Sequence, residues 1–153
     1  MRRAGLIVAL LVAGAGVAAA GAAERPALDA TKYPQDTPQK ALSSLIKALE
    51  TRDLYYWLAH LVIPEDSKRL TEKYGSLDKA VEVNADEKNA ERLKTQCTWM
   101  KKLLSSGTMT EGEENGVKWA RYQLGDRVLQ LDKQADGRWC MRTRVNAAQT
   151  PNK

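Results

Sequence analysis

The residues of this chain that suit acid–base chemistry gather in one short stretch. His60 is the only histidine among the 153 residues, so a Ser–His–Asp or Cys–His mechanism would have a single base to use. Tyr56 lies four positions before His60 and Asp53 one turn earlier, which makes the three side chains neighbours on a helix. An isomerase or dehydratase needs such groups, with a shifted pKa, inside an apolar pocket. The structural interpretation is simpler: His60 is a partly exposed helix residue and Asp53 is a helix N-cap.

The two cysteines allow two interpretations. Cys97 and Cys140 are separated by 42 residues, and a disulfide that closes this loop would stabilise the fold by roughly 3 to 4 kcal/mol. Two buried thiols would instead act as small hydrophobic side chains. Neither cysteine has the spacing of a redox motif, and one histidine with two distant cysteines supplies no ligand set for zinc. We therefore expect no metal and no cofactor.

Large aromatic side chains are the candidates for a ligand pocket or an interface, although most such residues serve as core area. The candidate aromatic residues are Trp57, Trp119, Tyr122 and Trp139. Trp119 is of particular interest, because strand alternation places it on the face opposite Ala120, Tyr122 and Leu124. If these three face the helices, Trp119 lies on the outer face of the sheet and marks a patch for a dimer or a partner.

The amino terminus predicts export. The chain opens with MRR, continues with an apolar run from Leu6 to Val12, and then with a Gly/Ala stretch up to Ala23 before the first acid, Glu24. These are the three regions of a secretory signal peptide. The apolar core of about 12 residues is shorter than the about 20 that a membrane-spanning helix needs. We expect residues 1–23 to be cleaved, the mature protein to be periplasmic or extracellular, and membrane attachment only through an uncleaved signal.

The charge of the chain argues against a nucleic-acid partner. Twenty-four basic and 19 acidic residues give a net charge of +5, and removal of the two arginines in the signal lowers it to +3. Lysines and arginines are interleaved with acids along the predicted helices, so there is no one-sided basic face of the kind that nucleic-acid binding needs.

The mature chain predicts a linker over 24–36, one α+β domain over 37–145 and a flexible tail over 146–153. Thr37 as N-cap with Pro38 at the first helical position begins the first helix, Asp53 caps the second, and Gly75 ends a polar third helix. Asn84, with Glu87 three residues later, is expected to cap a long fourth helix. The helices are expected at about 38–52, 54–62, 65–74 and 85–106.

Beyond Thr108 the apolar period changes from 3.6 to 2, and turn signals recur every 8 to 12 residues, which predicts strands. The expected hairpin turns are Asn115-Gly116, Gly125-Asp126 and Asp136-Gly137. The expected strands lie at 108–113, 117–124, 127–134 and 138–145. Helices followed by antiparallel strands predict an α+β fold, in which N-terminal helices pack on one face of a curved C-terminal sheet.

Three strings carry a resemblance to a known superfamily: TPQKALSSLIKALETRDLYYWLAHL, NGVKWARYQL and VLQLDKQADGRWCM. Three local features resemble those of the cone-shaped, nuclear-transport-factor-two-like superfamily, which includes ketosteroid-isomerase-like proteins. They are the Pro-led helix at Thr37-Pro38, the turn at Asp53 and the "dGrW" hairpin at 136–139, and each marks the start or end of an element. The chain resembles these proteins over nearly the whole mature domain. It departs from them in one respect: the strand and hairpin between the early helices and the long helix have no clear counterpart.

The resemblance implies a cone-shaped α+β roll with a cavity between sheet and helices, and it leaves the function open because the superfamily hosts several. The first hypothesis is an exported non-catalytic domain that binds a small apolar ligand or a protein partner, with a homodimer through the sheet as one arrangement. The second is a small isomerase or dehydratase that uses Asp53, Tyr56 or His60. The third is a structural accessory protein of the cell envelope.

Overall fold

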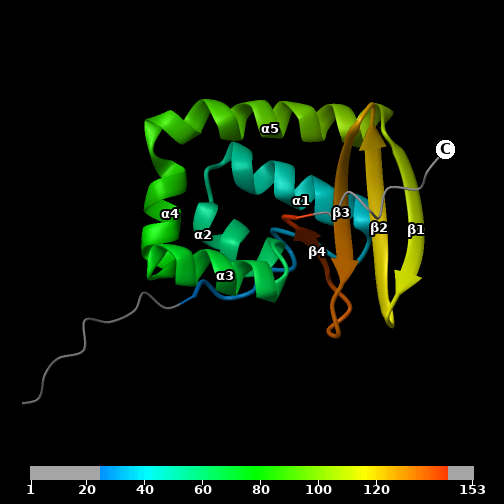
Figure 1. Cartoon of the computed structure of the whole chain (residues 1–153), viewed down its shortest axis with the longest axis horizontal. Helices are drawn as coiled ribbons and strands as arrows, with labels where there is room; N and C mark the ends of the chain where they lie inside the picture. Colours follow the sequence, from blue (N-terminus) through cyan, green and yellow to red (C-terminus); the bar gives the residue numbers. More distant parts are fainter. Residues whose placement is uncertain (1–24, 145–153) are drawn as a thin grey trace, which may run out of the picture.

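The computed structural model describes residues 25–144, which form helices followed by an antiparallel sheet (Figure 1). The elements in chain order are α1 (Pro38–Glu50), α2 (Leu54–Tyr56), the π-helical segment η1 (Trp57–Leu61), α3 (Pro64–Tyr74), α4 (Leu77–Ala85), α5 (Glu87–Ser106), β1 (Thr108–Glu114), β2 (Val117–Leu124), β3 (Arg127–Lys133) and β4 (Trp139–Arg142). The fold is therefore α+β, as the sequence predicts.

The sheet is a meander with the strand order β1-β2-β3-β4, all neighbours antiparallel. At the first hairpin Asn115 and Gly116 have φ values of 52° and 77°, the left-handed conformation that a two-residue turn of type I′ requires. In the register of the sheet Tyr122 lies opposite Leu129, and Leu131 lies opposite both Ala120 and Met141. These five apolar side chains form the inner face of the sheet.

The helices cover this inner face. In Figure 1, α3, α4 and α5 form three sides of a frame around α1 and α2, and the sheet stands beside it. The inward-facing side chains of α1 and η1 pack against those of α5 and of the sheet, and together they form one hydrophobic core. Its most deeply buried large apolar members are Leu42, Leu45, Leu58, Leu61, Met100, Leu103 and Leu131. Burial of this continuous apolar face is the main force that holds the helices on the sheet.

The sequence predictions for the first and third helices and for the hairpins are confirmed. The Thr37 side chain accepts a hydrogen bond from the backbone N–H of Lys40, and Pro38 opens α1. Gly75 ends α3 with a φ of 88°. The Asp53 carboxylate caps α2 by accepting from the N–H of Tyr56.

Two helix predictions need correction. The second helix is not uniformly α-helical, because it passes into a π-helical segment at Trp57 and ends in extended backbone at Val62. The segment before the long helix is itself a helix, α4, capped by Ser76. Asn84 lies within α4, buried, and donates to the carbonyl of Ala80 at 2.7 Å, so the N-cap of α5 is Asp86 rather than Asn84.

Part of the predicted linker belongs to the core. Tyr33 is 0% exposed and Gln35 3% exposed. The side-chain amide nitrogen of Gln35 donates to the carbonyls of His60 and Trp139 at 2.9 and 3.0 Å, and the backbone carbonyl of Gln35 accepts from the N–H of Trp139. This stretch ties η1 to β4, so it does not act as a free linker. The predicted signal at 1–23 and the predicted tail at 146–153 lie outside the described residues. Within residues 25–144, no helix combines the length and the hydropathy needed to cross a membrane.

The cysteines are free thiols, which corrects the disulfide alternative. Cys97, on α5, approaches the carbonyl of Ile46, and Cys140, on β4, approaches the carbonyl of His60. The two contacts place the sulfur atoms in separate parts of the fold. Both thiols are buried, so each fills space as a small hydrophobic side chain.

Candidate functional site

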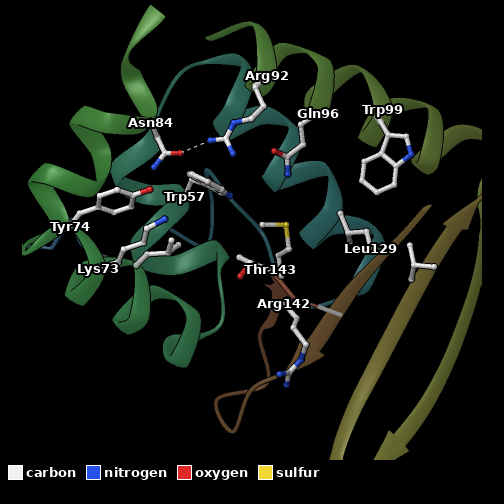
Figure 2. A pocket seen from close by; sticks show the side chains of 13 residues that line it. Trp57, Lys73, Tyr74, Asn84, Arg92, Gln96, Trp99, Leu129, Arg142 and Thr143 are labelled. Carbon is white, nitrogen blue, oxygen red and sulfur yellow. Dashed lines mark hydrogen bonds between the residues drawn. The ribbon is translucent and has the colours of Figure 1, made fainter. Parts of the chain in front are cut away.

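A cavity of about 490 Å³ opens between η1, α3, α4 and α5 on one side and the ends of β3 and β4 on the other. Figure 2 shows the side chains that line it. Its floor is made of buried residues, namely Trp57, Asn84, Leu129 and Met141. Its rim carries exposed residues, namely Lys73, Arg92 and Thr143. Cavities of this volume are of the size that small organic ligands occupy in proteins.

The local structure of α3 and α5 explains how the polar residues reach the cavity. Arg92, Gln96 and Trp99 are spaced at i, i+4 and i+7 on α5, so they form one stripe beside the buried seam of that helix. Lys73 lies in the last turn of α3, and Gly75 then ends the helix in the left-handed conformation. The C-terminal end of α3 and the middle of α5 therefore face each other across the cavity.

Asn84 fixes the position of one basic group. Its amide nitrogen donates to the carbonyl of Ala80, which leaves the amide oxygen turned toward α5. The guanidinium of Arg92 donates to that oxygen at 3.0 Å, and Figure 2 marks this bond with a dashed line. Across the cavity, the ammonium of Lys73 lies 5.0 Å from the ring centroid of Tyr74, a distance typical of a cation–π contact.

The lining is basic. It holds Lys73, Arg92 and Arg142, and none of the lining residues among 25–144 is an aspartate or glutamate. Arg142 is neutralised, because its guanidinium donates to the buried carboxylate of Asp132. Over residues 25–144 neither Lys73 nor Arg92 forms an ion pair. The cavity therefore has two positive charges at its rim that no carboxylate of residues 25–144 pairs with.

The floor of the cavity holds an unsatisfied donor. The indole nitrogen of Trp57 is buried and has no hydrogen-bond partner among residues 25–144, and the same is true of Trp99. A buried N–H without an acceptor costs about 1–3 kcal/mol. In Figure 2 the indole of Trp57 lies between the side chains of Lys73 and Gln96.

The acid–base candidates come together, but they do not line this cavity. The rings of Tyr56 and His60 are 4.8 Å apart between centroids. The Tyr56 hydroxyl accepts from the N–H of Asp29 and donates to its carbonyl, at 3.0 and 3.2 Å, and a His60 ring nitrogen contacts the carbonyl of Pro26. These groups hold the N-terminal segment against η1.

Asp53 has a similar structural role. Its carboxylate accepts from the hydroxyl of Tyr33 at 2.8 Å and from the ammonium of Lys32 at 2.9 Å, besides capping α2. Burial raises the pKa of this carboxyl, but the hydrogen bonds from Lys32, Tyr33 and the Tyr56 N–H outweigh that effect and leave the pKa below its usual value. Asp53 is therefore a charged anchor for the preceding segment, as the structural interpretation expects.

Of the aromatic residues selected from the sequence, Trp57 alone lies in the cavity. Tyr122 and Trp139 are buried in the core. Burial raises the pKa of Tyr122 to about 12. Trp119 lies on the opposite face of β2 and stacks on the guanidinium of Arg121, 4.1 Å from the ring centroid. It also covers Gly112, where a Cβ atom would fall 2.2 Å from the indole.

Sequence reasoning missed most of the cavity. Arg92 is an exposed residue of the long helix, yet it bonds to Asn84 and lines the cavity. The stripe of Arg92, Gln96 and Trp99 beside the apolar seam is the signal that could have identified this wall. Lys73 and Tyr74 carried no signal of their own, because the sequence predicts α3 only as a polar helix.

A second groove, of about 510 Å³, lies between α1 and α5. Two of its three basic residues are close to acids, since Glu50 pairs with Lys101 and Lys94 approaches Glu91, and the third, Arg52, donates to the carbonyl of Ala85. It includes no residue of the sheet. These features favour the cavity of Figure 2 as the candidate site. Comparison of the chain with protein-family models, with curated proteins and with solved structures found no match.

Proposed function

We propose that this protein is an exported, non-catalytic binding domain that takes up a small ligand in the cavity between its helices and its sheet. The observation that carries the proposal is the cavity itself, which has a largely apolar floor and a polar, basic rim. Concave sites of this size and composition are typical of small-molecule binding. The proposal includes membership of the cone-shaped superfamily that the sequence resembles, supported by a helical layer packed on one face of an antiparallel sheet.

Binding is favoured over catalysis by the use that the fold makes of its acid–base residues. Asp53, Tyr56 and His60 each bond to the segment that precedes α1. An acid–base catalyst must instead reach its substrate within hydrogen-bond distance. The cavity offers donors and cations, and these groups orient a ligand without transferring a proton at neutral pH.

The experiment that tests this proposal is a titration of the mature chain, residues 24–153, with small naphthalene probes. Tryptophan emission reports binding, because Trp57 and Trp99 line the cavity. We expect saturable 1:1 binding of 2-naphthoate, 2-naphthol or both. The variant Gln96→Trp fills the cavity and is expected to weaken binding at least about tenfold.

The matched control is Lys102→Trp, which places the same side chain on an exposed position of the same helix, outside the cavity. This control should bind the probes as the parent does. Equal binding by Gln96→Trp and Lys102→Trp would place the ligand elsewhere and overturn the proposal, as would the absence of binding of any probe.

A further inference from the structure

We infer that the ligand of this cavity is a small organic anion, with a carboxylate held at the rim and a planar or compact apolar body on the floor. The inference rests on the proposed function and adds the chemical class of the ligand. It changes the sequence expectation of an apolar ligand, because the cavity is polar at one end.

The first observation is the pair of cations at the rim. Lys73 comes from α3 and Arg92 from α5, so they approach the opening from opposite walls. Neither has a carboxylate within 4 Å over residues 25–144. Most other exposed basic residues of the helices have an acid close by, as Lys68, Lys79 and Lys101 do. The rim therefore has a positive potential that an anion would neutralise.

The second observation is that Arg92 is held in place before any ligand arrives. Its guanidinium donates to the amide oxygen of Asn84, and Asn84 is itself held by the carbonyl of Ala80. A guanidinium has five N–H donors, and this bond uses one of them. The remaining donors are available to a carboxylate, and the prior positioning reduces the entropy lost on binding.

The third observation concerns the floor. Leu129 and Met141 are buried apolar side chains of the sheet, and the indole of Trp57 forms the neighbouring wall. Trp57 is 6% exposed, and its N–H has no acceptor in the described part of the chain, residues 25–144. The floor thus suits a compact apolar body. An ammonium ligand fits less well, because the two cations at the rim repel it.

The test compares three probes of similar size and different charge: 2-naphthoate, 2-naphthol and 2-naphthylmethylammonium. We expect the naphthoate to bind about tenfold more tightly than the naphthol, a difference of about 1.4 kcal/mol, and the ammonium to bind more weakly than either. The preference for the naphthoate should shrink as NaCl is raised from 20 mM to about 1 M, because salt screens exposed charges. Affinity for the naphthol should not fall with salt.

Two variants locate the preference. Arg92→Gln and Lys73→Gln should each lower the affinity for the naphthoate about threefold to tenfold and leave that for the naphthol unchanged. Lys102→Gln, on an exposed face of α5 outside the cavity, is the matched control and should change neither. The Lys73 side chain is exposed, and its ammonium contacts the ring of Tyr74, so Lys73→Gln tests the inference even if loss of the Arg92–Asn84 bond disturbs the fold.

The outcomes separate the inference from the function it rests on. If all three probes bind equally and Gln96→Trp blocks them, the cavity binds ligands and the inference is wrong. If the naphthoate preference survives in both Arg92→Gln and Lys73→Gln, the anion is held elsewhere and the inference is again wrong. If no probe binds, both proposals fail.

Discussion

At the scale of single residues, a buried carboxylate organises the outer face of the sheet. Asp132 is 2% exposed, and it accepts from the amide of Gln130 and from the guanidinium of Arg142, both at 2.7 Å. Gln130 in turn accepts from the Nε of Arg121 at 2.8 Å. One carboxylate therefore aligns polar side chains on β2, β3 and β4.

The substitution Asp132→Asn should lower the free energy of unfolding by about 1–3 kcal/mol, because Arg142 loses the anion that balances it. Water partly compensates, since the Arg142 side chain is 38% exposed. Urea unfolding followed by circular dichroism measures the change. Asp126→Asn, in an exposed turn, is the control and should cost less than about 0.5 kcal/mol. Equal losses for the two variants would show that the Asp132 network has no special weight.

The two thiols provide a second test at this scale. Burial raises the pKa of Cys140 to about 11 and raises that of Cys97 above its ordinary value. Since the thiolate is the reactive form, both cysteines should react slowly with Ellman's reagent in the folded protein at pH 8. Two thiols per chain should react at once after denaturation in guanidinium without reductant. If no thiol reacts after denaturation, the two cysteines are oxidised, which would contradict the free thiols of this fold.

At the scale of elements, Asp66 joins the start of α3 to the end of β4. Its carboxylate accepts from the N–H of Thr143 at 2.7 Å and from Arg69 at 2.8 Å. Burial raises the pKa of Asp66, but these hydrogen bonds outweigh it and leave the pKa below its usual value. The pKa is thus lower in the folded chain than in the unfolded one. The stabilisation is present above the unfolded value, near 3.8, and is lost as the pH falls through the folded value.

The stability of the protein should therefore decline below about pH 5, and Asp66→Asn should decline less steeply. We expect the variant to lose about 1–2 kcal/mol at pH 7 and clearly less at pH 3. Urea unfolding at the two pH values measures this, with Glu65→Gln, on an exposed neighbouring residue, as the control. A loss that is the same at pH 3 and pH 7 would contradict a charged role for Asp66.

The N-terminal segment depends on the Tyr56 hydroxyl. Tyr56→Phe removes both hydrogen bonds to Asp29, and we expect a loss of about 1 kcal/mol in unfolding free energy and faster proteolysis before residue 33. Tyr55→Phe is the matched control, because it makes the same chemical change one residue away. Equal protease resistance of Tyr56→Phe and Tyr55→Phe would show that the hydroxyl does not hold the segment.

The sequence predicts the sheet better than the site, for a physical reason. The turn at Asn115-Gly116 and the alternation along β2 are local signals, so three hairpins and the outward position of Trp119 follow from them. The cavity depends on where α3, α4 and α5 lie relative to the sheet, which no local pattern encodes. Helix α4 was not predicted, although Ser76 is a good N-cap. The buried position of Asn84 was therefore not predicted either, because it depends on that helix. Trp57 was recognised as a pocket candidate because it is an aromatic residue on an apolar helix face.

At the scale of the whole molecule, ligand binding and stability should be linked. A ligand that binds only the folded chain stabilises it by about 2.7 kcal/mol at about 100 times its Kd. We expect saturating 2-naphthoate to raise the unfolding temperature of the parent protein, and to raise that of Lys102→Trp as much. Differential scanning calorimetry measures both. A similar rise in Gln96→Trp would contradict binding in the cavity.

The central claim, that the cavity floored by Trp57 is the binding site, is tested most directly by NMR of the indole N–H groups. The chain has four tryptophans, which give four ¹⁵N–¹H indole signals that Trp→Phe variants assign. Addition of 2-naphthoate is predicted to shift the Trp57 signal, because the indole lines the cavity, and to leave the Trp119 signal on the outer face unchanged. A shift of Trp119 without a shift of Trp57 would contradict the account.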